Sequence, residues 1–157
     1  DFTVIVDYAH EPASLEAAYR AVQLFAPKRI IALLGSQGGG RDKAKRPILG
    51  RIASQFADYI ILTNEDPYSE NPLKIIEEIE KGFLQIPMTK SQIPKYEKIL
   101  DRKGAIRKAL SLARAGDAVI LTGKGGEKSM CVAGGRKVAW DEGEIVNEEI
   151  RNMAKLQ

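Results

Sequence analysis

A short segment rich in glycine and basic residues, 35–46, is the strongest candidate for binding chemistry in this sequence. Three consecutive glycines run directly into Arg41, Lys43, Lys45 and Arg46. Glycines lack a Cβ, so backbone N–H groups can approach a bound oxyanion, and the arginine guanidinium is a planar fork that suits a carboxylate or a phosphate. The segment therefore predicts an anion-binding loop, although a mobile basic loop on a solvated surface has the same composition.

Polar groups also follow the apolar run 2–6, where Asp7, Tyr8 and His10 stand close together. Asp7 is either a turn or helix-capping carboxylate or an acceptor for ligand hydroxyl groups. His10 is a lone imidazole, which is more typical of local hydrogen bonding than of a general base. If run 2–6 is a parallel strand, these groups lie at the sheet edge where α/β proteins bind their ligands.

Two further polar turns follow the apolar runs 59–62 and 117–121. The first carries Glu65, Asp66 and Glu70 in a segment with two prolines, which predicts a long ordered loop. These carboxylates are either ordinary surface acidity or a site for an amine or for a cation paired with the basic segment. The second turn has several glycines, but no segment has the glycine, lysine and serine or threonine spacing of a P-loop.

Apolar runs and helical periodicity predict the elements that must position these groups. We predict strands at 2–6, 30–34, 59–62, 95–100 and 117–121. We predict helices from Ser14 to Phe25, from Ile48 to Phe56, from Leu73 to Phe83, from Lys103 to Ala115 and from Asp141 onward. The alternation predicts an α/β fold with three layers: a mostly parallel sheet with helices on both faces.

Several details of this prediction are specific enough to test. Leu15, Ala18, Tyr19, Val22 and Phe25 form one apolar face of the first helix, and Leu73, Ile76, Ile79 and Phe83 one face of the third. Asp101 is expected to cap the fourth helix and Gly116 to end it. A polar connector spans 86–94. The Gly134-Gly135 pair within 128–138 predicts a hairpin that adds antiparallel strands at the edge of the sheet.

Composition excludes several classes of protein. We interpret residues 1–157 as a single domain with 44% hydrophobic residues and a net charge of +3, which does not indicate a nucleic-acid partner. No run approaches the roughly 18 apolar residues of a membrane span. A single cysteine and a single histidine predict neither an internal disulfide nor a metal site, and both suit the cytoplasm. A strand that begins almost at residue 1 suggests a piece of a longer protein.

Four motifs, in this order and spacing, resemble the C-terminal domain of the Mur ligases. They are Asp7-Tyr-Ala-His10, the run Gly39 to Pro47, the turn Asp66-Pro67-x-x-Glu70 and Gly123-Lys-Gly-x-Glu127. The resemblance covers nearly the whole chain and implies a Rossmann-like domain. It also implies an N-terminal domain for a uridine nucleotide and a central ATPase domain, both absent from this chain.

Within that family the chain looks most similar to the muramyl-tripeptide synthetases, which add the third amino acid of the peptidoglycan stem peptide. The resemblance implies that ATP, with Mg²⁺ bound mainly by the central domain, activates the carboxylate of UDP-N-acetylmuramyl-dipeptide as an acyl phosphate. The amine of the incoming amino acid then attacks it. No catalytic or metal-binding residue is expected within this domain, which alone should be inactive.

Family motifs assign roles to residues of this chain. Asp7 aligns with a carboxylate that contacts the ATP ribose, and Arg41 with an arginine that holds a carboxylate of the amino acid. Gly123 and Glu127 align with positions at the distal end of that amino acid. The full set that the resemblance implies is Asp7, Tyr8 and His10 for the nucleotide, and Arg41, Lys43, Asp66, Tyr68, Gly123 and Glu127 for the amino acid.

Two departures bear on the substrate. The usual Asp-Asn-Pro-Arg turn reads Glu65-Asp-Pro-Tyr68 here, and a common histidine is replaced by Gly126. In the diaminopimelate-adding members that arginine pairs with the extra carboxylate, so its loss predicts a diamino acid with a free distal amine, lysine or ornithine. Alternatives are a regulatory or scaffolding nucleotide-binding module, and a sister amide ligase of the same superfamily. The intact Gly-Gly-Arg-Asp-Lys run disfavours the sister ligase.

Overall fold

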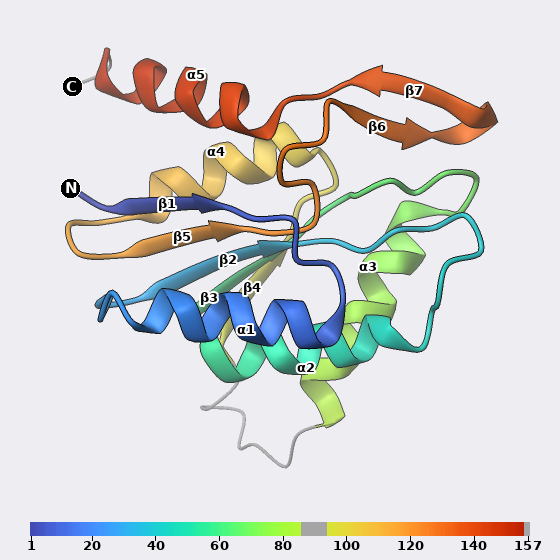
Figure 1. Cartoon of the computed structure of the whole chain (residues 1–157), viewed down its shortest axis with the longest axis horizontal. Coiled ribbons are helices and arrows are strands. Elements are labelled where there is room, and N and C mark those ends of the chain that lie inside the picture. The colour runs from blue at the N-terminus through green and yellow to red at the C-terminus, as the bar shows by residue number, and fades with distance from the viewer. Residues whose placement is uncertain (86–93, 156–157) are drawn as a thin grey trace.

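The computed structural model describes residues 1–85 and 94–155, so the predicted connector 86–94 lies outside the described residues except for its last position. These residues form a five-stranded parallel sheet, a separate two-stranded antiparallel sheet and helices on both faces (Figure 1). The strands are β1 Thr3–Val6, β2 Ile30–Leu34, β3 Tyr59–Leu62, β4 Lys95–Lys98, β5 Ala118–Leu121, β6 Ser129–Val132 and β7 Arg136–Ala139. The helices are α1 Pro12–Gln23, α2 Lys45–Phe56, α3 Pro72–Glu80, α4 Arg102–Leu112 and α5 Glu142–Ala154, with 3-10 turns at Lys81–Gln85 and Ala133–Gly135.

The sheet has the strand order β1-β5-β2-β3-β4 with every pair parallel. All residues of β2 and β5 are buried, because helices cover both faces of the sheet and a continuous apolar run then suits both. The two outer strands, β1 and β4, contain exposed positions. The predicted α/β class, parallel sheet and helical layers are confirmed.

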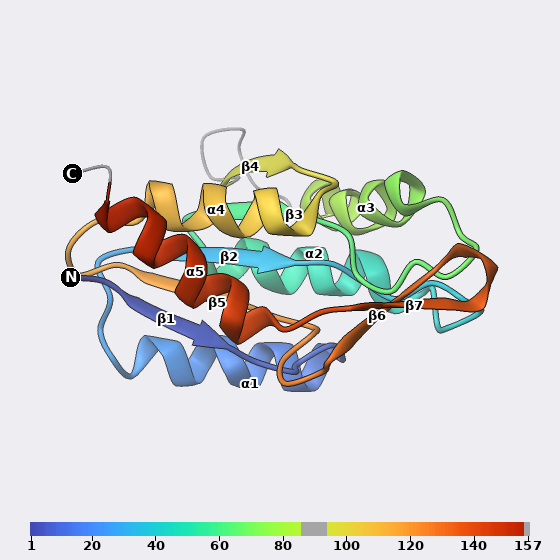
Figure 2. The ribbon, with the colours of Figure 1, turned by 90° about the horizontal axis from the view of Figure 1, so that it is seen from above.

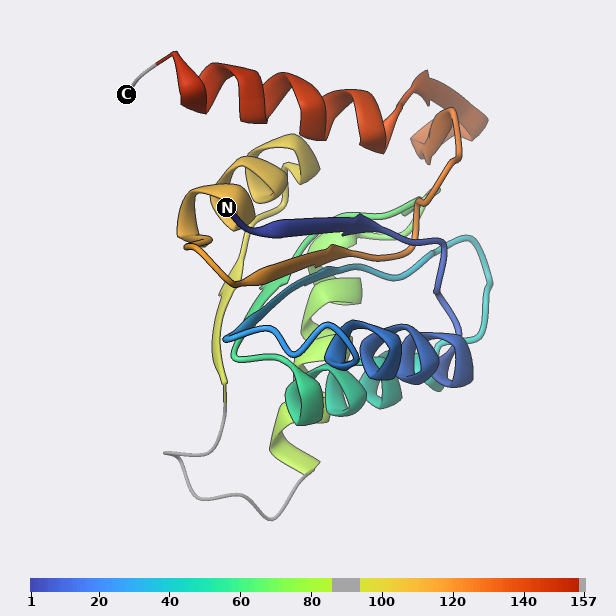
Figure 3. The same cartoon turned by 60° about the vertical axis from the view of Figure 1, so that its left-hand side comes forward.

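Helices α1, α2 and α3 cover one face of the sheet, and α4 and α5 cover the other (Figures 1 and 3). The path from β1 through β4 moves across the sheet in one direction, and α4 carries the chain back to β5 on the opposite face. Right-handed crossovers require this change of face. After β1, β2 and β3 the chain turns toward the face covered by α1, α2 and α3, whereas after β5 it turns toward the other face. The loop after β5 therefore diverges from the loops after the neighbouring strands β1 and β2, which leaves a crevice at the carboxyl ends of the strands.

The structure corrects the apolar face predicted for α1. The helix ends at Gln23, so Leu24 and Phe25 lie beyond it and are 85% and 70% exposed. Ala26 then takes a positive φ of 47°, which turns the chain toward β2. The predicted residues Leu15, Tyr19 and Val22 are buried as expected, because they lie on the face that meets α2 and the sheet.

The face predicted for α3 is also shifted. Leu73 is 49% exposed, and Ile75 is buried beside Ile76 and Ile79. The α-helix ends at Glu80 and continues as a 3-10 turn, in which Phe83 is buried against the same core. Pro72 and the Asn71 cap set where the helix begins, and the core contacts then select its inner face.

Helix α4 begins as predicted, with the Asp101 carboxylate accepting a hydrogen bond from the backbone N–H of Gly104 at 3.0 Å. It ends at Leu112, before the predicted Ala115. Gly116 is therefore not the residue that ends the helix. It has a φ of 90° in the turn before β5, where its N–H donates to the backbone oxygen of Asp1.

The predicted hairpin forms, but it is not an edge of the main sheet. Strands β6 and β7 pair only with each other, and Gly134 and Gly135 have positive φ in the turn between them. The turn after β5 carries the chain beyond the carboxyl ends of the strands, so the hairpin projects over that end of the sheet (Figures 1 and 2). A hydrogen bond from Tyr68 N–H to the Cys131 carbonyl joins it to the loop after β3.

Among the described residues, no helix is long and apolar enough to span a membrane.

Candidate functional site

The loops after β1, β2, β3 and β5, together with the β6–β7 hairpin, enclose a pocket of about 410 Å³. Six of the nine residues that the family resemblance assigns to binding line it: Tyr8, His10, Arg41, Asp66, Tyr68 and Glu127. The remaining lining residues are Glu11, Gln37, Asp42, Lys45, Ser129, Cys131 and Lys137. Three other predicted residues, Asp7, Lys43 and Gly123, lie outside the lining.

The basic segment is largely neutralised by carboxylates from elsewhere in the fold. Arg46 is 1% exposed and donates to Glu78 at 2.6 Å and to Glu70 at 3.1 Å. Lys43 lies 3.0 Å from the same Glu70. Hydrogen bonds from Arg46 and Lys43 lower the pKa of Glu70 to about 2. These two cations therefore stabilise the loop, which corrects the expectation that the whole segment faces an anion.

Lys45 and Arg41 are the cations of this segment that line the pocket. Lys45 is buried and donates to Glu11 at 2.5 Å, which ties the start of α2 to the loop after β1. Arg41 is exposed and lies beside the Tyr68 phenol, whose pKa is raised by a hydrogen bond with Cys131 and lowered by one with Arg41, with a net rise. Arg41 is thus the exposed cation of this segment in the pocket lining.

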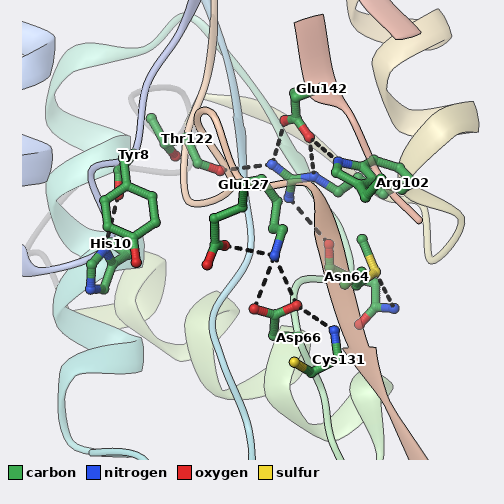
Figure 4. A network of polar contacts seen from close by, with 12 residues as sticks. Tyr8, His10, Asn64, Asp66, Arg102, Thr122, Glu127, Cys131 and Glu142 are labelled. Atoms are coloured by element: carbon green, nitrogen blue, oxygen red, sulfur yellow. Dashed lines mark hydrogen bonds and ion pairs between the residues drawn. The ribbon is translucent and has the colours of Figure 1, made fainter. Parts of the chain in front are cut away.

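In the turn after β5, Lys124 joins two predicted acids. Its ammonium donates to both oxygens of Asp66 at 2.9 and 3.0 Å and to Glu127 at 2.7 Å (Figure 4). Lys124 is fully buried; burial lowers its pKa, but the hydrogen bonds to Glu127 and Asp66 outweigh this and raise it. Our sequence interpretation did not assign Lys124 a role. The one sequence signal for Lys124 is its place between Gly123 and Gly125 in the fourth motif. Its burial becomes visible only in the folded structure.

Asp66 is held in an unusual turn. Its φ is 27° and that of Tyr68 is 49°, both in a region that side chains disfavour. The turn lets the Asp66 carboxylate accept the backbone N–H of Cys131 at 2.7 Å as well as the Lys124 ammonium. Both carboxylate oxygens of Asp66 are consequently engaged within the protein.

Glu65 lies beneath this site as a fully buried carboxyl. Burial raises its pKa to about 7. Its Oε1 has no hydrogen-bond partner among the described residues. A Cβ added to Gly123 would lie 1.9 Å from the other oxygen, Oε2, so Gly123 shapes the site by leaving room for Glu65.

Gly123→Ala is expected to destabilise the protein by about 2 kcal/mol, because the new Cβ meets Glu65 and the residue must also keep a φ of 102°. Gly126→Ala is the control in the same turn. A Cβ there meets nothing within 4 Å, so the expected change is below about 0.5 kcal/mol. Urea unfolding measures both. Equal losses for the two variants would show that the Glu65 contact is unimportant.

A second buried network fixes the ends of β3 and β5. Arg102, at the start of α4, donates to both oxygens of Glu142 at 2.6 and 3.0 Å. It also donates to the backbone carbonyls of Thr122 at 2.8 Å and Asn64 at 3.2 Å (Figure 4). One guanidinium therefore joins two pocket-forming loops to the start of α5.

The loop after β1 presents its residues differently. Asp7 accepts the Ala9 N–H at 2.7 Å, the local turn role considered from the sequence. Tyr8 is 49% exposed, and its ring packs edge-to-face against His10 at a centroid distance of 4.7 Å. A hydrogen bond between His10 Nδ1 and the Tyr8 carbonyl holds the imidazole. Tyr8 and His10 thus offer an exposed ring surface at one side of the pocket.

Comparison with known proteins places these features in a family. Residues 1–125 match the family model described as "Mur ligase, glutamate ligase domain". The chain is 43% identical over 149 residues to a UDP-N-acetylmuramoyl-L-alanyl-D-glutamate--2,6-diaminopimelate ligase of Alkaliphilus oremlandii, covering 95% of this chain and 29% of that protein. It is 42% identical over 157 residues to a UDP-N-acetylmuramyl-tripeptide synthetase of Borreliella burgdorferi, covering 100% and 30%.

A solved structure of a UDP-N-acetylmuramoyl-L-alanyl-D-glutamate--2,6-diaminopimelate ligase has the same fold. The TM-score is 0.84 at 30% identity, and the alignment covers 96% of this chain and 29% of that one. The chain thus spans about 30% of the length of the curated relatives that it matches.

Proposed function

The chain belongs to the Mur ligase family, whose glutamate ligase domain it matches over residues 1–125, and from this premise we propose that it is the amino-acid-binding domain of an ATP-dependent ligase. The complete protein joins a diamino acid to UDP-N-acetylmuramyl-dipeptide as the third residue of the peptide. The observation that carries this proposal is one pocket that brings the exposed Arg41 and the partly exposed Glu127 together.

In this proposal Arg41 binds the α-carboxylate of the incoming amino acid. A guanidinium suits a carboxylate because two parallel N–H donors match its two oxygens. Glu127 binds the distal ammonium, because its side chain is 37% exposed and keeps one carboxylate oxygen outside the contact with Lys124. Opposite charges in one pocket orient the amino acid. The chain's contribution is this binding and orientation.

The distal group is proposed to be an ammonium without a neighbouring carboxylate, as in lysine or ornithine. Tyr68 occupies the position of the family's arginine, so this position offers no cation for a second carboxylate. Relatives named for diaminopimelate and relatives named only as tripeptide synthetases are about equally similar to this chain. The choice therefore depends on the pocket residues, which include one further cation, Lys137.

The nucleotide is proposed to approach from the loop after β1. Asp7 uses Oδ1 for the Ala9 N–H, which leaves Oδ2 for a ribose hydroxyl. The exposed Tyr8 ring offers a surface for the nucleotide. Hydrolysis of ATP supplies the driving force for amide formation, and a substrate carried on UDP suits the cytoplasm. The Mg²⁺ that accompanies ATP is proposed to bind mainly to the central domain of the complete protein.

The proposal is tested with a panel of amino acids and the full-length protein. Phosphate release is measured with ATP, UDP-N-acetylmuramyl-dipeptide and lysine, ornithine or diaminopimelate. Lysine or ornithine should stimulate release most strongly. Stimulation by diaminopimelate alone would reject the lysine and ornithine assignment, and no stimulation by any amino acid would reject the ligase function.

Arg41→Ala in the same assay is expected to raise the KM for the amino acid about 30-fold, because it removes a charge-assisted hydrogen bond of about 2 kcal/mol. The KM for ATP should change little. Arg51→Ala is the control, since Arg51 is an exposed arginine of α2 outside the pocket lining. An unchanged amino-acid KM in Arg41→Ala would remove Arg41 from the binding site.

A further inference from the structure

Three charged groups beside the pocket, Lys124, Asp66 and Glu127, differ sharply in exposure. The Lys124 side chain is 0% exposed, that of Asp66 is 5% and that of Glu127 is 37%. A ligand can therefore reach Glu127, whereas Lys124 lies behind the two acids. The group carries one net negative charge, because the ammonium neutralises one of its two carboxylates.

Three of the four carboxylate oxygens in this group accept hydrogen bonds from Lys124. They are Oδ1 and Oδ2 of Asp66 and Oε2 of Glu127. Oδ1 of Asp66 also accepts the backbone N–H of Cys131. The remaining oxygen, Oε1 of Glu127, is the one left for a ligand. The hydrogen bond from Lys124 to Oε2 fixes the Glu127 carboxylate and so determines where Oε1 points.

Lys124 also links two loops that are distant in sequence. Asp66 comes from the turn after β3, and Glu127 from the turn after β5, where Lys124 itself lies. Without the ammonium, the Asp66 and Glu127 carboxylates, which both lie within 3.0 Å of its nitrogen, would face each other with no cation between them. Like charges at short range disfavour this arrangement, so one acid would take up a proton or the turns would move apart.

From this geometry we propose that Lys124 is a positioning residue that determines selectivity for a distal ammonium. It neutralises Asp66 and holds Glu127 so that Oε1 alone receives the substrate's ammonium. The inference rests on the proposed function, in which Glu127 binds that group. Lys124 touches no substrate and acts through Glu127.

A purely structural role for Lys124 makes a different prediction. Loss of a buried ammonium that only stabilises the fold would weaken binding of all amino acids alike and lower turnover. A positioning role changes the preference between amino acids that differ only at the distal end. Lysine and norleucine are such a pair, because norleucine has the same carbon chain without the distal ammonium.

The experiment is a double-mutant cycle in the full-length protein, with kcat/KM measured for lysine and for norleucine. The variants are Lys124→Met, Glu127→Gln and both together. Lys124→Met should lower the ratio of lysine to norleucine about tenfold, mainly through the KM for lysine. In the Glu127→Gln background the same substitution should change the ratio less than twofold, because the group through which it acts is gone.

Two results would overturn the inference. One is an unchanged ratio of lysine to norleucine in Lys124→Met. The other is a ratio in the double variant that equals the product of the two single effects, because the two residues would then act independently. A wild-type protein that uses no amino acid would instead overturn the proposed function. Lys128→Met is the matched control from the same turn. Lys128 is 74% exposed and lies outside the lining of this pocket, so the ratio should be unchanged.

Asp66→Asn provides a second test that leaves the buried ammonium in place. The ammonium then faces a single acid, and the group becomes neutral overall. The ratio of lysine to norleucine should again fall about tenfold, with thermal unfolding used to confirm a folded protein. If Lys124→Met does not fold, an unchanged ratio in Asp66→Asn overturns the inference by itself.

Discussion

Arg102→Met is expected to destabilise the protein by about 3–5 kcal/mol, because it leaves the carboxylate of Glu142 buried without its cation. Both side chains are almost completely buried, with 1% of the arginine and none of the glutamate exposed. The substitution also removes donors from the carbonyls of Asn64 and Thr122 at the pocket-forming loops. The free energy of unfolding in urea at neutral pH measures the loss.

Lys103→Met is the matched control for that prediction. Lys103 is the next residue of α4 and pairs with Glu148 of α5 at 2.8 Å, but these side chains are 38% and 52% exposed. An exposed ion pair is worth less than about 1 kcal/mol, because water screens it. Adding Glu142→Gln to Arg102→Met should recover part of the loss, since it removes the unpaired charge. Equal losses in Arg102→Met and Lys103→Met would contradict the explanation.

Stability is expected to fall as the pH rises from about 4.5 to about 7, by about 3 kcal/mol from Glu65 alone. Burial raises the pKa of Glu65 from 4.5 in the unfolded chain to about 7 in the folded protein. Between these two values the folded state keeps a proton that the unfolded state has lost. The protonated carboxyl therefore stabilises the fold fully below pH 4.5, and this contribution is lost as the pH passes 7.

Glu65→Gln should remove this dependence, because the amide stays neutral at every pH. Between pH 4.5 and pH 8 the wild type should lose about 3 kcal/mol of unfolding free energy that the variant does not lose. The variant's stability relative to the wild type should therefore rise by that amount. Glu77→Gln is the control, since Glu77 is exposed on α3 and its variant should follow the wild-type curve. Parallel curves for Glu65→Gln and the wild type would show that Glu65 is ionised throughout this range.

The sequence determined much of the fold through local patterns. The apolar run Ile30–Leu34 is a buried central strand, and polar turns follow β1, β2, β3 and β5 as predicted. Strand order makes those turns meet, because parallel strands place their carboxyl ends at one edge of the sheet. Four short motifs were enough to identify the family, since a family motif is a local pattern.

Other features depended on residues that are far apart in the chain. Arg46 looked like a ligand for anions, yet it is neutralised by Glu78, which is 32 residues away on α3. Lys124 looked like one more turn residue until its contact with Asp66, 58 residues away, showed that it is buried. Local periodicity likewise placed Leu73 in the core, although the contacts of α3 select Ile75.

The physical reason is that a sequence pattern reports the backbone's local preference, whereas burial and charge pairing are decided by which distant groups arrive at the same place. The sequence thus determined the α/β fold, the family and the loops that form the pocket. Only the tertiary structure decided which charges stay exposed and which are enclosed. Arg41 and Glu127 remain accessible, while Arg46 and Lys124 are enclosed by carboxylates from other elements.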